Sequence, residues 1–261
     1  MFGNACSLIG AVHLPPMPGA AGYCGNVRVI LDSVIGDAVA YKEEGFDALI
    51  VENTHDTPYL KGAVHPETVS AMTYITGEIQ KRVGLPMGVQ VLAGANLEAL
   101  AIAVALELDF IRVEGFVFAH IGDEGFHDAC APALLRRRFD LKADRVKIFA
   151  DIKKKHASHA ITADVDLAES ARAAEFFKAD GVVVTGVRTG SAPSPDEARE
   201  AKESVDISVL IGSGVDPDNL RDFASCSDAL IIGSYVKEGG KWQNPVDRER
   251  CREIMKAAGR S

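Results

Sequence analysis

Eight short runs of apolar, mostly β-branched residues recur along the 261-residue chain, and each is followed by a longer amphipathic stretch. The runs are continuous rather than alternating with polar residues, which is typical of parallel strands covered on both faces. They span residues 8–12, 48–51, 87–91, 110–113, 146–150, 181–184, 209–211 and 229–232. This repetition predicts an α/β protein made of a single (β/α)8 TIM barrel over residues 1–261. A doubly wound open sheet is the alternative.

The stretches between the runs carry helix signals. We expect helices over residues 27–44, 66–83, 96–106 and 166–179, one near 133 and one from about 247. Two more should begin at Ser194-Pro195 and at Asp216-Pro217. A polar side chain caps the first N–H groups of a helix, and proline suits its first turn.

Charge and cysteine usage limit the partners and the compartment. The net charge of −9 argues against nucleic acid, which needs a basic face, but a few local donors suffice for a small anionic substrate. The five cysteines are scattered, without a C-x-x-C pair, which predicts reduced thiols. No apolar run approaches the ~20 residues of a membrane helix, and a strand begins by about Ser7. We therefore expect a cytoplasmic protein without membrane insertion; the sequence leaves a homo-oligomer open.

Polar side chains cluster where the predicted strands end. In (β/α)8 enzymes the chemistry lies at the carboxyl ends of the strands, so these residues should meet at one mouth of the barrel. They are His13, Glu52, Asn53, Gln90, Arg112, Glu114, Asp151, Lys155, His156 and Thr185. Other interpretations exist: His13 as a structural histidine, Gln90 and Arg112 as a buried polar layer, and the run 153–155 as a solvated face. The convergence of so many ionisable groups favours a functional site, with Asp151 and Lys155 as candidates for acid/base or electrophilic roles.

Two glycine-serine turns follow the last two strands and predict a phosphate site. The first comprises Gly212, Ser213 and Gly214, and the second comprises Gly233 and Ser234. Glycine lets the backbone approach an anion closely, and the turns after strands seven and eight are the usual phosphate site of this fold. Ordinary tight turns are the alternative. Neither turn is a P-loop, because the Lys-Ser/Thr ending is missing.

The long loop over residues 116–132 predicts a mobile lid over the site. Its His and carboxylate residues could also bind a divalent metal ion, although their spacing matches no established ligand motif. They are His120, Asp123, Glu124, His127 and Asp128. We predict no metal site and no cofactor, and leave two alternatives open: a divalent ion, and a flavin phosphate in the glycine-serine turns.

Several segments resemble the BtpA family, also called BtpA/SgcQ, over nearly the full length. They are Gly10–Gly19, Val51–Asn53 with Asp56 and Pro58, Phe110–Glu114, Ala150–His156, Gly212–Val215, Gly233-Ser234, Gly239–Trp242 and Asn244–Asp247. Many members carry an Arg-Asn-Asp cluster after strand three, where this chain has Ala93–Asn96. The family name comes from photosystem I biogenesis. Other relatives resemble genes grouped with carbohydrate or nucleoside uptake and kinases, which implies catabolism of a phosphorylated sugar or nucleoside.

Two hypotheses follow. The first is a hydrolase, lyase or isomerase acting on a phosphorylated sugar or nucleoside held by the two turns. Its catalytic residues are then His13, Glu52, Asp151 and Lys155, with Lys155 as an electrophile or Schiff-base amine; the other polar residues at the mouth bind substrate. The second is a non-catalytic biogenesis factor for a membrane complex of the photosystem I type. It predicts an apolar docking surface and a barrel mouth without chemistry.

Overall fold

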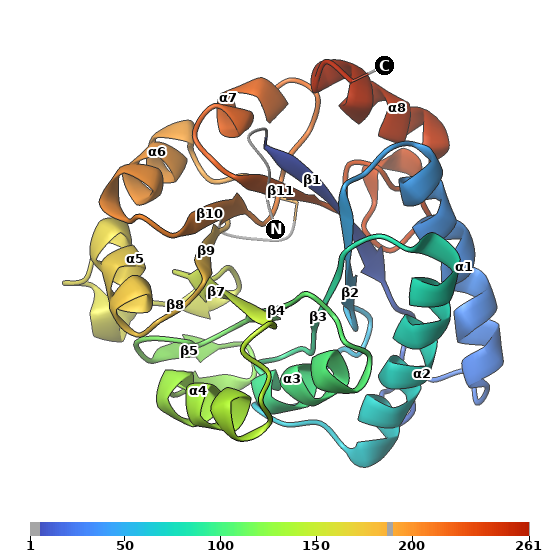
Figure 1. Ribbon diagram of the computed structural model, residues 1–261, viewed down its shortest axis with the longest axis horizontal. Coiled ribbons are helices and arrows are strands. Elements are labelled where there is room, and N and C mark those ends of the chain that lie inside the picture. The colour runs from blue at the N-terminus through green and yellow to red at the C-terminus, as the bar shows by residue number, and fades with distance from the viewer. Residues whose placement is uncertain (1–5, 187–189, 261) are drawn as a thin grey trace.

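Eight parallel strands close into a barrel in the computed structural model, which describes residues 6–186 and 190–260 (Figure 1). In spatial order they are β1 (Ser7–His13), β2 (Ala48–Glu52), β3 (Met87–Gln90), β4 (Phe110–Val113), β7 (Lys147–Ile152), β9 (Gly181–Val184), β10 (Ser208–Ile211) and β11 (Ala229–Ile232). The first and last strands pair in parallel, with Leu8 opposite Leu230, so the sheet has no open edge. The TIM-barrel prediction is confirmed, and the open sheet is excluded.

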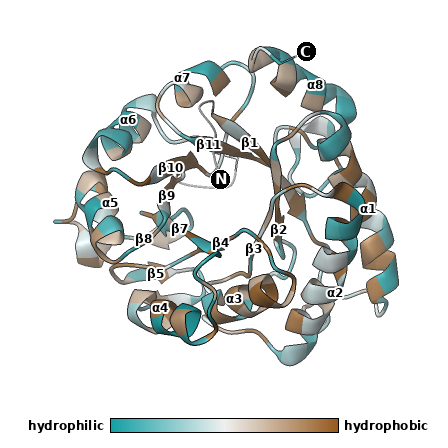
Figure 2. Cartoon of the chain, in the orientation of Figure 1, coloured by the Kyte–Doolittle hydropathy of each residue, from teal (hydrophilic) through white to brown (hydrophobic). Residues whose placement is uncertain are grey.

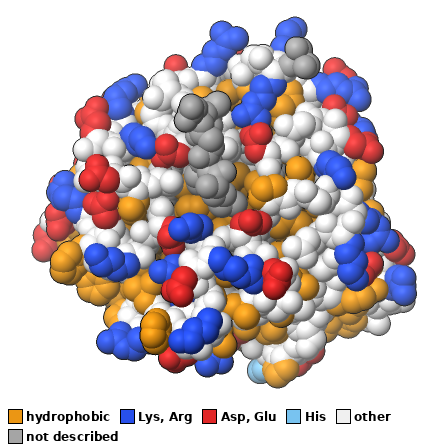
Figure 3. Space-filling model, in the orientation of Figure 1, with side chains coloured by type: hydrophobic (Ala, Val, Ile, Leu, Met, Phe, Trp, Pro, Cys, Tyr) orange, Lys and Arg blue, Asp and Glu red, His pale blue; other side chains and the backbone are white. Residues whose placement is uncertain are grey.

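Helices separate successive barrel strands and form the outer ring seen in Figure 1. They are α1 (Val27–Glu43), α2 (Pro66–Val83), α3 (Asn96–Ala105), α4 (Ala131–Asp140), α5 (Leu167–Phe176), α6 (Pro195–Ser204), α7 (Leu220–Ala224) and α8 (Arg248–Ala257). No helix among the described residues is both long and apolar enough to cross a membrane. On the face shown in Figure 3, the described lysines and arginines are interspersed with aspartates and glutamates.

The two predicted helix starts have different outcomes. Ser194 caps α6 in a reciprocal capping box with Glu197, as the sequence signal indicates. The helix expected at Asp216-Pro217 begins only at Leu220 and is five residues long. The Asp216 side chain nevertheless accepts hydrogen bonds from the backbone N–H groups of Asp218 and Asn219, and its carbonyl accepts from the Leu220 N–H. These are the bonds of a helix N-cap, so the predicted start signal is present and only the regular helix begins later than predicted.

Apolar side chains fill the barrel interior below the mouth. They include Ile9, Ile50, Phe110, Phe149, Val183, Leu210 and Ile231. The rings of Phe110 and Phe149 lie 5.4 Å apart between centroids. Gly88 makes room for them, because a Cβ there would lie 2.2 Å from the Phe110 ring. The barrel is therefore a packed core and not a pore, in agreement with the apolar strands in Figure 2.

The loop expected to be a lid contains regular structure. Strands β5 (His120–Gly122) and β6 (Gly125–His127) form a hairpin, and β8 (Ala157–Ser158) pairs with β5. Two short 3-10 helices complete the fold, η1 (Ala160–Thr162) and η2 (Glu238–Gly240). The stacked rings of His120 and His127, 5.0 Å apart, anchor the hairpin. Its motion as a lid stays a prediction.

Candidate active site

A cavity of about 370 Å³ lies at the carboxyl ends of the barrel strands. Its volume is within the usual range for a small-molecule site. Most of the predicted site residues line it: His13, Glu52, Gln90, Arg112, Glu114, Lys155, His156, Gly212, Ser213, Gly214, Gly233 and Ser234. Strand ends from β1 to β7 supply most of its acid, base and amide groups, and the turns after β10 and β11 supply Gly212, Gly214 and Gly233. The strand-end residues and the two turns therefore share a single cavity.

Arg112 on β4 holds the floor of this cavity together. Its Nε and Nη2 donate to Asp151 at 3.0–3.2 Å, and its Nη1 donates to Glu52 at 3.2 Å. Burial opposes the charge of Arg112, but the carboxylates of Asp151 and Glu52 raise its pKa well above the usual value. The guanidinium is thus engaged with two protein carboxylates, as expected of a buried polar layer, although one edge also lines the cavity.

Asp151 lies behind Arg112 and does not line the main cavity, although it faces a smaller one beneath the β5–β6 hairpin. Its side chain is only 2% exposed, and both oxygens accept hydrogen bonds from Arg112. Burial raises the pKa of Asp151, while the charge of Arg112 opposes that rise. This geometry favours a positioning role, and a catalytic role for Asp151 stays a prediction.

Lys155 lines the cavity. Burial, followed by the charge of Arg112, lowers its pKa from 10.5 to about 8. A lysine in this range is partly unprotonated near neutral pH and can act as a nucleophile. The flanking Lys153 and His156 have left-handed backbones, with φ of 47° and 54°, which is uncommon outside glycine. The backbone N–H of Lys155 donates to Thr185, so Thr185 positions this turn.

Lys154 is a functional candidate that the sequence did not single out. It is 7% exposed, and its Nζ donates to Glu114 Oε1 at 3.2 Å. The other oxygen of Glu114 is buried and has no hydrogen-bond partner among the described residues. Glu114 therefore combines a fixed orientation with a free acceptor atom beside the cavity. The position of Lys154 directly after a strand was the available signal, but its inward direction depends on the unusual turn.

His13 at the end of β1 is held by a distant loop. Its Nδ1 lies 2.9 Å from the backbone carbonyl oxygen of Trp242. Burial, followed by the charge of Lys237, lowers the pKa of His13 to about 3. The ring is therefore neutral near pH 7, so one ring nitrogen is a hydrogen-bond acceptor, and a catalytic role for His13 stays a prediction.

Asn53 is fully buried and lies outside the cavity lining. Its amide donates to Asp56, and its oxygen accepts from the backbone N–H of Leu92. Asn53 therefore joins the loops after β2 and β3. Three aromatic residues that the sequence did not place at the site do line the cavity: Tyr59, Tyr235 and Trp242. For Trp242, the Gly239–Trp242 segment was the available signal.

Packing explains part of the two glycine-serine turns. A Cβ on Gly214 would lie 2.0 Å from the backbone nitrogen of Ala192, and φ at Gly214 is 71°. The Ser213 hydroxyl accepts from the Gly186 N–H and donates to the Ser191 carbonyl. These contacts join the turn after β10 to the segment after β9, so packing between neighbouring loops accounts for Ser213 and Gly214 without a bound anion.

Anion-binding capacity nevertheless remains in the turns. The backbone N–H groups of Gly214, Val215 and Ser234 donate to no acceptor within residues 6–186 and 190–260, and all three residues line the cavity. Unpaired N–H groups in a turn are typical anion ligands. Within the same residues, no group of three or more His, Cys, Asp or Glu is arranged to hold a metal ion.

The fold and cavity define the class: a (β/α)8 barrel with a cavity at the carboxyl ends of its strands. Solved structures share this fold. One is (S)-3-O-geranylgeranylglyceryl phosphate synthase from Thermoplasma acidophilum in complex with sn-glycerol-1-phosphate, with a TM-score of 0.61 and 14% identity over 98% of this chain and 94% of that one. Orotidine 5'-phosphate decarboxylase from Pyrococcus horikoshii also has a TM-score of 0.61, with 13% sequence identity over 97% of this chain and 100% of that one.

Residues 4–260 match the BtpA family, and the chain belongs to it. An uncharacterised mitochondrial protein of Caenorhabditis elegans is 43% identical, over 95% of this chain and 91% of that protein. The photosystem I biogenesis protein BtpA of Synechocystis is 35% identical, over 96% of this chain and 87% of that protein. The family resemblance inferred from the motifs is confirmed.

Proposed function

We propose that the protein is an enzyme that cleaves or isomerises a phosphorylated sugar or nucleoside in the cavity at the barrel mouth. The observation that carries this proposal is the shared cavity. It places the unpaired N–H groups of Gly214, Val215 and Ser234 together with the buried amine of Lys155. Backbone N–H groups suit a phosphate, and an amine of lowered pKa suits carbonyl chemistry. The sn-glycerol-1-phosphate complex of a protein with the same fold supports the choice of a phosphorylated ligand.

The proposed chemistry assigns separate roles to the groups around the cavity. The phosphate binds at the two turns and fixes the far end of the substrate. Lys155 acts either as an ammonium that polarises a carbonyl or hydroxyl oxygen of the substrate, or as an amine that forms an imine with a carbonyl carbon with loss of water. Glu114 and Glu52 accept the substrate proton. Arg112 and Asp151 hold the strand ends in register beneath them.

Binding to phosphorylated probes tests the first half of the proposal. Inorganic phosphate and a panel of pentose and nucleoside phosphates should raise the melting temperature. A ligand at one hundred times its dissociation constant adds about 2.7 kcal/mol to the free energy of unfolding. Unphosphorylated ribose and adenosine are the matched controls. If no phosphorylated compound raises the melting temperature, the proposed phosphate site is wrong.

Chemical trapping tests the role of Lys155. Borohydride added with a stabilising carbonyl compound should attach that compound covalently to the wild-type protein, and mass spectrometry of peptides should locate it on Lys155. Lys155→Met should stay unlabelled while still binding inorganic phosphate. If another residue is labelled, or none is, Lys155 does not form an imine and can act only as an ammonium that polarises the substrate oxygen.

A role in biogenesis of a membrane complex is the second candidate, because the Synechocystis relative carries that name. It requires an apolar docking surface, and Phe139, Phe176 and Phe126 are at least half exposed. The lowered pKa of Lys155 at the mouth favours the enzyme, because perturbed ionisable groups cluster at catalytic sites.

A further inference from the structure

Two hydrogen-bond acceptors face the cavity side by side at the ends of β1 and β2. The carbonyl oxygen of Trp242 can only accept, so His13 Nδ1 carries the ring hydrogen, and Nε2 of the neutral ring has a bare lone pair. Glu52 Oε2 lies 3.9 Å from this Nε2, whereas Oε1 of the same carboxylate accepts from Arg112. We call the pair formed by His13 Nε2 and Glu52 Oε2 the acceptor notch.

Neither atom of the acceptor notch can satisfy the other. Both are acceptors, and 3.9 Å exceeds hydrogen-bond length. The two side chains are each 7% exposed and line the cavity, so the group that fills the cavity must supply the hydrogen-bond donors for both atoms. Acceptors that a ligand removes from water are normally paired, and this pair takes two donor hydrogens from the bound group. The space beside Nε2 is open because Gly233 has no side chain; a Cβ there would lie 3.0 Å from Nε2.

The position of the notch indicates the chemistry of its occupant. Gly233 adjoins the notch and directly precedes Ser234, whose N–H belongs to the proposed phosphate site. One hydroxyl offers a single hydrogen, but two adjacent hydroxyls offer two in neighbouring directions. We propose that the acceptor notch binds a vicinal diol of the phosphorylated substrate, with one hydroxyl donating to His13 Nε2 and the other to Glu52 Oε2. This inference rests on the proposed function, because the phosphate brings the diol to the notch.

Other donors could fill the same space, and they predict different specificity. The ammonium of Lys155 lines the same cavity and carries up to three hydrogens, and a bound water carries two. If either satisfied the notch, removal of a substrate hydroxyl would leave no acceptor unpaired. If the diol fills it, a deoxy analogue leaves a buried acceptor without a partner, which such sites reject strongly.

Calorimetric titration of the wild-type protein with three probes tests the diol. The probes are inorganic phosphate, D-ribose 5-phosphate and 2-deoxy-D-ribose 5-phosphate, whose furanose ring has no adjacent hydroxyl pair. We expect ribose 5-phosphate to bind about tenfold or more tighter than the deoxy compound, since a hydrogen bond to a charged group is lost. Equal affinities, or no gain of ribose 5-phosphate over inorganic phosphate, would overturn the inference. Failure of inorganic phosphate and both sugar phosphates to bind would overturn the proposed function itself.

Glu52→Gln gives a matched test of the notch. Its amide nitrogen replaces the Oε2 acceptor with a donor, so one hydroxyl of the diol loses its acceptor, and the ribose-to-deoxyribose ratio should fall to near one while the affinity for inorganic phosphate stays unchanged. The control is Asp123→Asn, which removes a carboxylate charge at the exposed rim of the same cavity and should keep the wild-type ratio. An unchanged ratio in Glu52→Gln would contradict the assignment.

Nitrogen NMR of the wild-type protein tests the protonation state of the notch directly. His13 Nε2, assigned by its absence in His13→Gln, should show the shift of an unprotonated nitrogen from pH 8 down to about pH 4, since burial lowers the pKa of this ring. Saturating ribose 5-phosphate should move that shift, and the deoxy compound should not. A protonated Nε2 at pH 7 would overturn the inference.

Discussion

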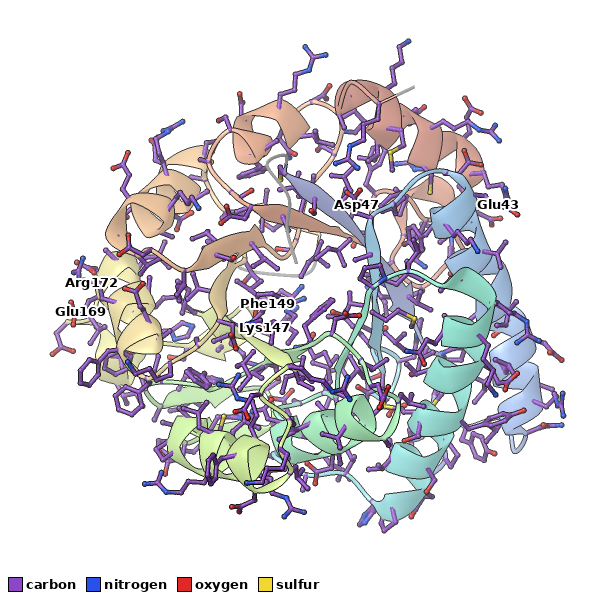
Figure 4. All side chains as sticks on the ribbon, viewed as in Figure 1. Glu43, Asp47, Lys147, Phe149, Glu169 and Arg172 are labelled. Atoms are coloured by element: carbon purple, nitrogen blue, oxygen red, sulfur yellow. The ribbon has the colours of Figure 1, made fainter. Side chains whose placement is uncertain are left out.

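The lower and upper halves of the barrel interior are built from the same strands but depend on different physics. On β7, Lys147, Phe149 and Asp151 lie two residues apart, so their side chains share one face of the strand. Figure 4 shows Lys147 and Phe149 toward the middle of the ring, whereas Glu43 and Glu169 lie on the outer helices. The layer around Phe149 requires only shape and volume. The layer around Asp151 requires that each buried charge is paired with an opposite charge. This layer holds the ionisable groups, so it is the one that could take part in a reaction.

The largest loss of stability is expected from a substitution in the lower, apolar layer. Phe149→Ala removes a ring that is 2% exposed and packs against Phe110. It should lower the free energy of unfolding by about 3–5 kcal/mol, measured by urea denaturation. Phe149→Leu is the control and should cost much less, because it leaves a smaller cavity. Affinity for inorganic phosphate should be unchanged in both folded variants. A large loss of affinity would show that the two layers are not separable.

Breaking the upper layer should cost about as much or slightly less, but for another reason. Arg112→Met leaves Asp151 and Glu52 buried without their partner, which typically costs about 3–5 kcal/mol. Adding Asp151→Leu removes one of these orphaned charges and should restore a good part of the loss. A double variant as unstable as the sum of the two single ones would mean that Arg112 and Asp151 contribute independently.

The pH dependence of stability should distinguish Lys155 from the surrounding layer. Its pKa is about 8 in the folded protein and 10.5 when unfolded, so the unfolded chain binds more protons between these values. Stability of the wild type should therefore rise with pH across that window, relative to Lys155→Met, by on the order of 3 kcal/mol in total. Lys155→Arg keeps its charge at every pH and should show no such rise. Parallel curves for wild type and Lys155→Met would contradict the lowered pKa.

The smallest change in stability is expected at Lys147, the first residue of β7. The Lys147 side chain is 46% exposed and forms an ion pair with Asp180 at 3.0 Å. Because exposed ion pairs contribute little, Lys147→Ala should change the free energy of unfolding by less than about 1 kcal/mol. The same urea titration measures this change. A loss comparable to that of Arg112→Met would remove the distinction between the exposed pair and the buried one.

The sequence predicted the barrel because its information is local. Each apolar run had to be covered on both faces, and each strand end carried a polar residue, so His13, Glu52 and Lys155 were placed at one mouth. The partners of these residues were not predictable in the same way. The ring of His13 is oriented by a carbonyl 229 positions away at Trp242. Gly214 is required by its packing against Ala192, and Asp151 is held by Arg112 on the neighbouring strand β4. Such roles depend on distances that periodicity and motif spacing do not contain.

A crystal structure with D-ribose 5-phosphate would locate both ends of a phosphorylated ligand at once. We expect the phosphate within hydrogen-bond distance of the N–H groups of Gly214, Val215 and Ser234, with the sugar lying toward Lys155, His13 and Glu52. A phosphate bound outside this cavity, or a cavity without ligand density at a concentration that saturates the protein in solution, would contradict this expectation.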